Sequence, residues 1–246
     1  MLNRYKLIVE YDGTNYHGMQ RQNDLPTIQQ ALENAIEKYC GQNQIYYCGR
    51  TDVGVHAMGQ VVHFDTTYDR SNISVIRGIN FYLNKNQISI IDAQKVDNNF
   101  HSRFSTKKRY YIYKIINRNS KLTFMSNTHL HCRQKLNIIA MQKAADYLVG
   151  QHDFSSFRGS GCTAISPVKT IDYIKIFYLQ NDEIHIEICA KSFLYNMVRN
   201  IVGSLLEVGT EKQQPEWIQM VLNAKNRVIA AKTAPAHGLY FYKAEY

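Results

Sequence analysis

The sequence predicts an α+β protein with mixed or antiparallel sheets. Strand-like and helix-like segments are mixed along the chain, and two strand patterns often follow one another, which disfavours a Rossmann-like parallel layout. The 246 residues are 45% hydrophobic and 20% charged, an ordinary composition for a globular chain that buries a sizeable core. No G-x-G-x-x-G or Walker motif occurs, so a nucleotide cofactor is not expected.

Two helices and three strands are predicted in the N-terminal half. The best-marked element is a helix at 27–40, because Thr27 and Gln30 form a capping-box pattern and Gly41 supplies the expected stop. Alternation and apolar periodicity assign the others. These are strands at 5–11, 60–65 and 87–96, and a helix at 71–83.

The C-terminal half contains further strands and three predicted helices. A helix at 136–149 should end at Gly150, and the strongest helical pattern of the chain, 192–208, should end at Gly209. Pro215 is expected to start a shorter helix. Strands are predicted at 109–116, 170–178, 183–190 and 239–242, and the second and third of these should form a hairpin.

Charge divides the chain unevenly. The net charge is +9, yet residues 1–104 carry ten basic and ten acidic side chains, so the excess falls in residues 105–246, which carry nineteen and ten. We therefore predict an N-terminal α+β domain at 1–104 and a basic α+β domain at 105–246, each compatible with a β-α-β-β-α-β unit. The asymmetry suggests a polyanion partner, most simply nucleic acid or an acidic membrane surface. A basic face that contacts only water is the alternative.

Several classes of site are disfavoured by residue spacing. The five cysteines form no C-x-x-C pair, so neither a disulfide framework nor a zinc ribbon is indicated. A metal site built from His17, His56 and His63 lacks ligand spacing, and none is expected. No apolar run approaches the ~18 residues that a membrane span needs, and no secretory signal is recognised. We expect a cytoplasmic protein with reduced thiols and no membrane partner.

The most unusual stretch of the sequence is 49–63, which contains three glycines, one Arg, one Asp and two His. Glycines around a charged pair indicate a loop whose backbone turns sharply or approaches a ligand closely. Asp52 lies in this loop, ahead of the strand at 60–65. By residue type alone, Asp52 is more often a turn or capping residue than a catalytic carboxylate.

The segment GRTDVGVHAMGQVVHF at 49–64 resembles the signature of the tRNA pseudouridine synthase A family. The similarity continues in the same order through blocks at 11–22, 100–113, 150–157, 193–203 and 233–240. This resemblance implies a pseudouridine synthase fold around a central basic cleft. It also implies an isomerase that converts uridine to pseudouridine in the anticodon stem-loop of tRNA, at tRNA positions 38, 39 and 40. The family acts as a homodimer and uses no metal, nucleotide or redox cofactor.

The resemblance also assigns roles to particular side chains. Asp52 is implied as the nucleophile, and Arg50 as a residue that holds the extruded nucleotide. Tyr111, aligned without gaps, is implied to stack on the target base, with Tyr110 as the alternative alignment. Arg199 is implied to pair with Asp52. Phosphate contacts are expected from Arg21 and from the acid-free window, with Lys108 and Arg109 ranked first there.

These residue types suit the isomerisation. The C1′–N1 bond must break and a C1′–C5 bond must form, with no co-substrate. An ionised carboxylate can act as the nucleophile, and a neighbouring Arg would lower its pKa and orient it. An aromatic ring would recover part of the cost of extruding the base. Without the resemblance, Tyr111 would be assigned to strand packing and Arg199 to a solvent-facing helix position.

The sequence departs from the family pattern at two places. Met19 stands where the family usually has Trp, and the loop at 83–88 lacks a Pro and an Asp. Three alternatives stay open at this point. One is a synthase restricted to some of these tRNA positions or to other RNAs. The second is a tRNA-binding or folding chaperone without chemistry. A membrane-surface protein is the third, and it is disfavoured because the helices at 27–40 and 192–208 are not strongly basic.

Overall fold

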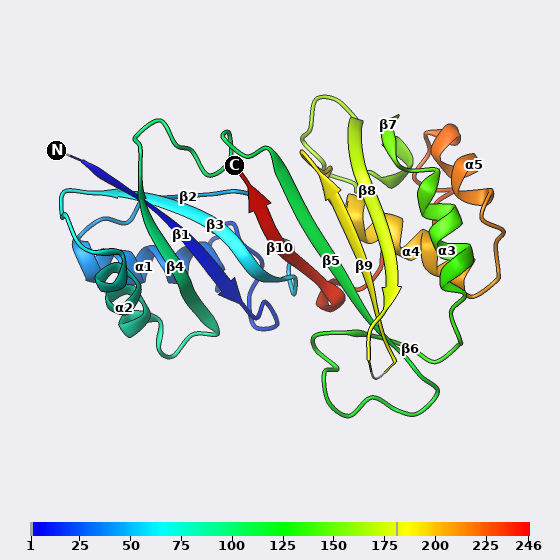
Figure 1. The fold of residues 1–246 in the computed structure, drawn as a ribbon, viewed down its shortest axis with the longest axis horizontal. Coiled ribbons are helices and arrows are strands. Elements are labelled where there is room, and N and C mark those ends of the chain that lie inside the picture. Colours follow the sequence, from blue (N-terminus) through cyan, green and yellow to red (C-terminus); the bar gives the residue numbers. More distant parts are fainter. Residues whose placement is uncertain (1, 181) are drawn as a thin grey trace. The chain divides into compact units, whose positions relative to one another are not determined.

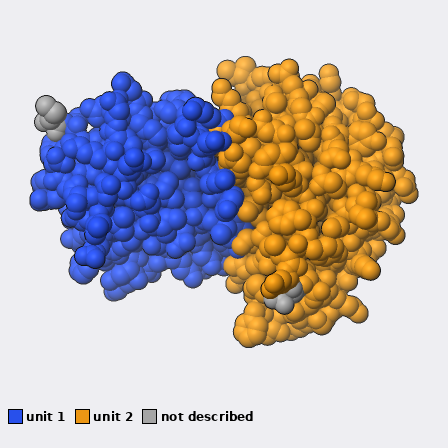
Figure 2. All heavy atoms as spheres, in the orientation of Figure 1, with its two compact units in different colours: residues 1–107, 240–246 blue, residues 108–239 orange. Residues whose placement is uncertain are grey.

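The computed structural model describes residues 2–180 and 182–246 and has a mixed α/β fold with parallel and antiparallel strand pairs, which confirms the predicted fold class. The chain forms two compact units, Met1–Lys107 with Tyr240–Tyr246 and Lys108–Leu239 (Figure 2). Compared with the predicted division at 104/105, the first unit extends three residues further and also contains the C-terminal strand. Whether these units are independent domains stays a prediction.

Unit 1 is a sheet with two helices (Figure 1). Strand β1 pairs with β3 on one side and β4 on the other, antiparallel to both, and β2 pairs with β3. The C-terminal strand β10 joins β3 in parallel, with Tyr240 opposite His56. The elements are β1 (Asn3–Tyr11), α1 (Ile28–Cys40), β2 (Ile45–Tyr47), β3 (His56–Thr66), α2 (Asn72–Leu83), β4 (Ile88–Val96) and β10 (Leu239–Glu245).

Local signals place the ends of α1 where the sequence predicts them. The Thr27 hydroxyl accepts a hydrogen bond from the Gln30 N–H at 3.3 Å. Gly41 adopts φ +71°, and its N–H donates to the Glu37 carbonyl at 2.7 Å. The side chains of Ile28, Leu32 and Ile36 on this helix are buried in the interior of unit 1. Both ends therefore follow from residues within one turn of the boundary.

Unit 2 contains an antiparallel sheet in the order β5, β9, β8, β7, with β6 parallel to β5. Helix α3 packs against β8 and α4 (Figure 1). The predicted hairpin is β8 and β9, but its connection includes residue 181, which lies outside the described residues. The elements are β5 (Lys108–Asn117), β6 (Leu130–Cys132), α3 (Ile138–Asp146), β7 (Gly150–Asp153), β8 (Val168–Tyr178), β9 (Glu183–Ala190), α4 (Met197–Gly209) and α5 (Trp217–Ala224), with 3-10 turns at Ser155–Phe157 and Ala236–Gly238.

Two predicted helices are wrong at their ends. Helix α3 stops at Asp146, and Gly150, at φ +100°, begins β7 instead of capping the helix. Helix α4 begins at Met197 because Asn196 adopts the left-handed conformation at φ 59°. The residues before it, 192–196, keep the apolar spacing of a helix without being helical. Phe193 in this stretch packs edge-on against Tyr111, with ring centroids 5.1 Å apart, so tertiary packing explains its apolar character.

Within the described residues, no helix is both long enough and apolar enough to cross a lipid bilayer. The five cysteines are free thiols. No group of three His, Cys, Asp or Glu side chains among the described residues has the geometry to hold a metal ion.

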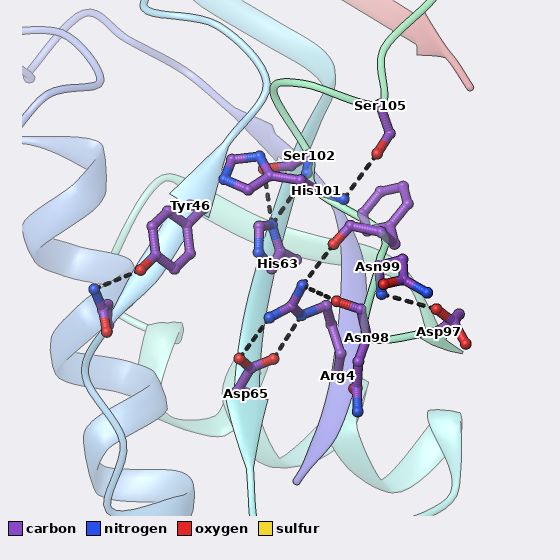
Figure 3. Close-up of polar contacts among 12 residues, drawn as sticks. Arg4, Tyr46, His63, Asp65, Asp97, Asn98, Asn99, His101, Ser102 and Ser105 are labelled. Carbon is purple, nitrogen blue, oxygen red and sulfur yellow. Dashed lines mark hydrogen bonds and ion pairs between the residues drawn. The ribbon is translucent and has the colours of Figure 1, made fainter.

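A partly buried ion pair lies at one end of the unit 1 sheet (Figure 3). The Arg4 guanidinium donates to both carboxylate oxygens of Asp65 at 2.7 Å each. Its third nitrogen donates to the carbonyls of Asn98 and Phe100 at 2.6 and 2.8 Å. The bond to Arg4 lowers the pKa of Asp65. Arg4 therefore ties the segment after β4 to β1 and β3.

His63 lies two residues before Asp65 on β3 and is 1% exposed. Its Nδ1 accepts a hydrogen bond from the Ser102 backbone N–H at 3.2 Å and lies 2.9 Å from the Ser102 hydroxyl. Burial, with a contribution from the Arg4 charge, lowers the pKa of His63 from 6.5 to about 4. The imidazole is therefore neutral in the folded protein at pH 7.

We expect His63 to make folding pH-dependent. Between pH 6.5 and 4 the unfolded chain binds a proton at His63 that the folded chain does not. The contribution of His63 is therefore complete above pH 6.5 and is lost as the pH falls toward 4. The loss between pH 7 and 4.5 should be about 2–3 kcal/mol. Urea unfolding across this pH range should show a smaller loss of unfolding free energy for His63→Gln than for wild type. If the unfolding free energies of the two proteins change equally with pH, His63 is not the group responsible.

Candidate functional site

Asp52 lies in a tight turn between β2 and β3. The Val55 N–H donates to the Asp52 carbonyl at 3.1 Å. Gly54, the third residue of this turn, has φ +74°, a conformation that favours glycine. Asp52 is half-buried, whereas Arg50 is exposed. Gly54 therefore allows the chain to reverse direction just after Asp52.

The loop after β1 holds this turn by close backbone contact. The Met19 N–H donates to the Thr51 carbonyl at 3.0 Å. A Cβ atom at Gly13 would lie 2.1 Å from the Val55 carbonyl oxygen, and one at Gly18 would lie 2.5 Å from that of Thr51. Only glycine allows these approaches. Met19 is fully buried, so its departure from the family pattern affects packing and not a surface that RNA could reach.

Buried polar side chains support the Asp52 turn from within the sheet. The Tyr11 and Thr51 hydroxyls are 2.8 Å apart, and the Gln60 amide donates to the Gly49 carbonyl at 2.9 Å. Tyr11 is 4% exposed and Gln60 is fully buried. Burial raises the pKa of Tyr11 to about 12, so its hydroxyl keeps its proton. These supporting residues were not predicted from the sequence, although Gln60 is a polar position at the start of an otherwise apolar strand pattern.

We expect the contributions of Tyr11 and Thr51 to the free energy of unfolding to be coupled through their hydrogen bond. Tyr11→Phe and Thr51→Val should each lower the free energy of unfolding by about 1–2 kcal/mol, because each leaves a buried hydroxyl short of a partner. The double variant should lose less than the sum of the two, since neither hydroxyl then remains. Urea unfolding of the four proteins measures this. Tyr82→Phe, at an exposed tyrosine on α2, is the control, and additive losses would contradict the coupling.

His56, directly after the turn, has a structural role. Its ring is 1% exposed and stacks on Tyr240, with centroids 4.8 Å apart. Its Nδ1 accepts a hydrogen bond from the Gly13 N–H at 3.0 Å. An Asp12 carboxylate oxygen lies 3.1 Å from the same nitrogen. The ring joins the loop after β1 to the start of β3.

Tyr111 lies on β5 in unit 2, and its side chain is 8% exposed. Its neighbour Tyr110 points to the other face of the strand, toward Tyr173, with ring centroids 6.4 Å apart. Tyr113 shares the face of Tyr111, two residues along the strand, and its hydroxyl donates to the Pro235 carbonyl at 2.8 Å. Tyr111 and Tyr110 therefore occupy different environments, and only one of them can match the family's stacking tyrosine.

The expected phosphate-binding side chains divide between the two faces of β5. Alternation places Arg109 on the face of Tyr111 and Lys108 on the opposite face. The Lys108 ammonium lies 3.4 Å from the Asp172 carboxylate, and the Arg109 guanidinium donates to the Lys191 carbonyl. Lys108 and Arg109, the two first-ranked candidates for phosphate binding, therefore lie in different surroundings. In unit 1, Arg21 is half-exposed and pairs with Glu33 at 2.9 Å.

Arg199 is the third residue of α4 and is half-buried. Its Nε donates to the Ala234 carbonyl at 2.8 Å, and its Nη1 donates to the Asn196 side-chain oxygen at 3.1 Å. The Ala234 N–H donates back to the Arg199 carbonyl at 3.1 Å. On the same helix face, a Cβ at Gly203 would lie 2.0 Å from the Lys232 carbonyl oxygen. The solvent-facing alternative for Arg199 is therefore wrong, because this face packs against residues 232–234.

The C-terminal block at 233–240 thus has a structural explanation. It bonds to Arg199 through Ala234 and to Tyr113 through Pro235, and a Cβ at Gly238 would lie 2.7 Å from the Tyr113 ring. The predicted catalytic residues are distributed over both units. Asp52 belongs to unit 1, and Tyr111 and Arg199 belong to unit 2.

The family model and the curated relatives that match this chain are all described as tRNA pseudouridine synthases, and the relatives match nearly the whole chain. A family model described as tRNA pseudouridine synthase matches residues 7–105 and 144–246. These segments include Asp52 and Arg199, whereas Tyr111 lies between them. A tRNA pseudouridine synthase A from Ehrlichia chaffeensis is 48% identical over 99% of this chain and 100% of its own length. Those from Ehrlichia ruminantium (strain Gardel) and Anaplasma phagocytophilum are 47% and 44% identical, each over 99% of this chain and 99% and 100% of their own.

Among solved structures, a chain of the archaeal box H/ACA sRNP Nop10–Cbf5 complex is similar with a TM-score of 0.34 and 9% identity. The match covers 82% of this chain and 43% of that chain, and it adds no argument about function. The residues matched by the family model include the Asp52 turn, the loop that holds it and the Arg199 helix. The chain therefore belongs to the tRNA pseudouridine synthase family and is an isomerase that makes pseudouridine in tRNA.

Proposed function

We propose that this synthase modifies the anticodon stem-loop of tRNA, at tRNA positions 38, 39 and 40, with Asp52 as the nucleophile. The observation that supports Asp52 is its place in a turn held from two sides, by the loop after β1 and by the buried Tyr11–Thr51 pair. A rigid turn keeps a carboxylate in one position for attack. The relatives' name, tRNA pseudouridine synthase A, supports the choice of substrate.

Conversion of uridine to pseudouridine breaks one bond to C1′ and forms another. A carboxylate attacks the extruded nucleotide, the C1′–N1 bond breaks, and C1′ joins C5 after the uracil turns. The bond between the carboxylate and the nucleotide then breaks, which regenerates the carboxylate. The C5 proton leaves to solvent, and N1 ends with a proton. We assign the attack to Asp52, the stacking of the base to Tyr111, and the stabilisation of the ionised carboxylate to Arg199. Arg50, exposed two residues before Asp52, holds the extruded nucleotide.

Binding of the tRNA backbone is assigned to basic side chains of both units. Arg21, Lys108 and Arg109 are the candidates, and Arg109 is preferred over Lys108 because it shares a strand face with Tyr111. The enzyme is proposed to act in the cytoplasm as a homodimer, without a metal or nucleotide cofactor. These statements follow the family resemblance, and size-exclusion chromatography with light scattering tests the dimer.

Product mapping tests the proposed substrate. Purified protein and an unmodified tRNA transcript with [5-³H]uridine should release tritium, because C5 loses its hydrogen when it bonds to C1′. Pseudouridine should then be found at positions 38–40 and should vanish when those uridines are replaced. Pseudouridine at one position only would indicate a synthase restricted to some of the three tRNA positions. Pseudouridine only outside the anticodon arm would contradict the proposal.

A further inference from the structure

A cavity of about 220 Å³ lies in unit 1 around the Arg4–Asp65 ion pair and has no role in the reaction described above. Its wall is formed by β1, β2, β3, the loop after α1 and the loop that contains His101 (Figure 3). His63, in this wall, lies seven residues along β3 from His56 beside the Asp52 turn. At ~3.3 Å per residue the cavity is roughly 20 Å from that end of the strand. Its occupant is therefore a group other than the reacting uridine.

Aromatic rings run from the inside of this cavity to the surface. The Tyr46 ring stacks on the buried His63 ring at 4.9 Å with an interplanar angle of 15°. The His101 ring meets His63 edge-on at 4.8 Å and contacts Phe104 at 4.4 Å. Tyr46 is 38% exposed and Phe104 is 75% exposed, and the Arg103 guanidinium lies 5.5 Å from the Phe104 ring. Exposed rings beside a basic side chain form a surface typical of contacts with unpaired bases.

The polar groups of the cavity offer both a donor and acceptors. Because Nδ1 of His63 accepts a hydrogen bond from Ser102, the ring proton is on Nε2. This Nε2 is buried and has no hydrogen-bond partner among the described residues. The Asp65 oxygens each accept one bond from Arg4 and have a further lone pair. The exposed loop after α1 adds the amides of Gln42 and Gln44.

We propose that this cavity binds an unpaired nucleobase of the tRNA, outside the nucleotide that is modified. A base presents donors and acceptors on one edge and a flat face for stacking. These match the polar groups of His63 and Asp65 and the exposed ring of Tyr46, which contacts the His101 ring at 5.2 Å. A phosphate group matches less well, because the Asp65 carboxylate faces the same space and balances the charge of Arg4.

Binding of tRNA at increasing salt tests the proposal. Tyr46→Leu keeps an apolar side chain but removes the ring, and it should raise the Kd for an unmodified tRNA transcript about 5- to 100-fold. The slope of log K against log salt should stay as in wild type, because phosphate contacts are kept. The matched control is Tyr82→Leu on α2, whose tyrosine is 39% exposed against 38% for Tyr46, and it should bind like wild type.

A second variant covers the case in which Tyr46→Leu folds poorly. Gln44→Trp changes an exposed loop residue whose amide donates to the Tyr46 hydroxyl at 2.6 Å, and the larger side chain should narrow the cavity, so it should also raise the Kd. Binding by both variants equal to that of Tyr82→Leu would overturn the proposal. A salt slope smaller by about one would overturn it in favour of a phosphate. Tritium release by wild type in the same preparation is scored separately, so failure of the proposed catalysis is distinguishable from failure of this inference.

Discussion

Asp52→Asn is expected to abolish pseudouridine formation while tRNA binding is kept. The amide has nearly the size of the carboxylate, so the turn with its bond from Val55 to the residue 52 carbonyl should persist. A neutral amide cannot serve as the nucleophile, so kcat should fall by at least ~10³-fold. Tritium release at saturating enzyme measures the chemical step, and filter binding measures the Kd for tRNA.

Asp92→Asn is the matched control, since it makes the same charge change at an exposed position on β4 and should react like wild type. Release of tritium by Asp52→Asn at the wild-type rate would remove Asp52 from the centre of the reaction. If neither wild type nor Asp52→Asn releases tritium although both bind tRNA, the assigned activity fails and a binding protein becomes the better description.

Arg199→Met is expected to cause the second-largest loss, about 10²-fold in kcat. In the proposed role, the guanidinium favours the ionised form of the catalytic carboxylate, so its removal should make that form harder to reach as the pH falls. The acid limb of the pH–rate profile should therefore move to higher pH. Arg199→Lys should recover part of the rate, because it restores the charge but not the planar group.

The position of the acid limb separates this role from a structural one. Arg199 also bonds to Ala234 and Asn196, so its loss could lower the rate by releasing the segment at 232–234. A rate loss without movement of the acid limb would favour that structural role and contradict the electrostatic one. Arg77→Met, at an exposed arginine on α2, should change neither quantity.

Elements whose signals are local could be predicted from the order of residues alone. The ends of α1 follow from a Thr hydroxyl that caps one end and a glycine that adopts positive φ at the other, and both groups act within one helical turn. Alternation likewise predicted the main strands, with ends displaced by a few residues. The Asp52 loop was recognised because its glycines and charged pair are adjacent in the chain, and the ordered blocks carried the family assignment.

Contacts between distant segments could not be predicted in this way and are seen only in the folded chain. Helix α4 begins at Met197 because Asn196 adopts a left-handed conformation, and the earlier apolar residue Phe193 packs against Tyr111. Periodicity cannot distinguish such packing from a helix face. The Tyr11–Thr51 pair, the Gly18 approach to the Asp52 turn and the bonds of Arg199 to Ala234 each join residues more than thirty positions apart. Their partners are selected by the folded backbone, which brings them within hydrogen-bond distance, and a pattern read along the chain contains no record of that distance.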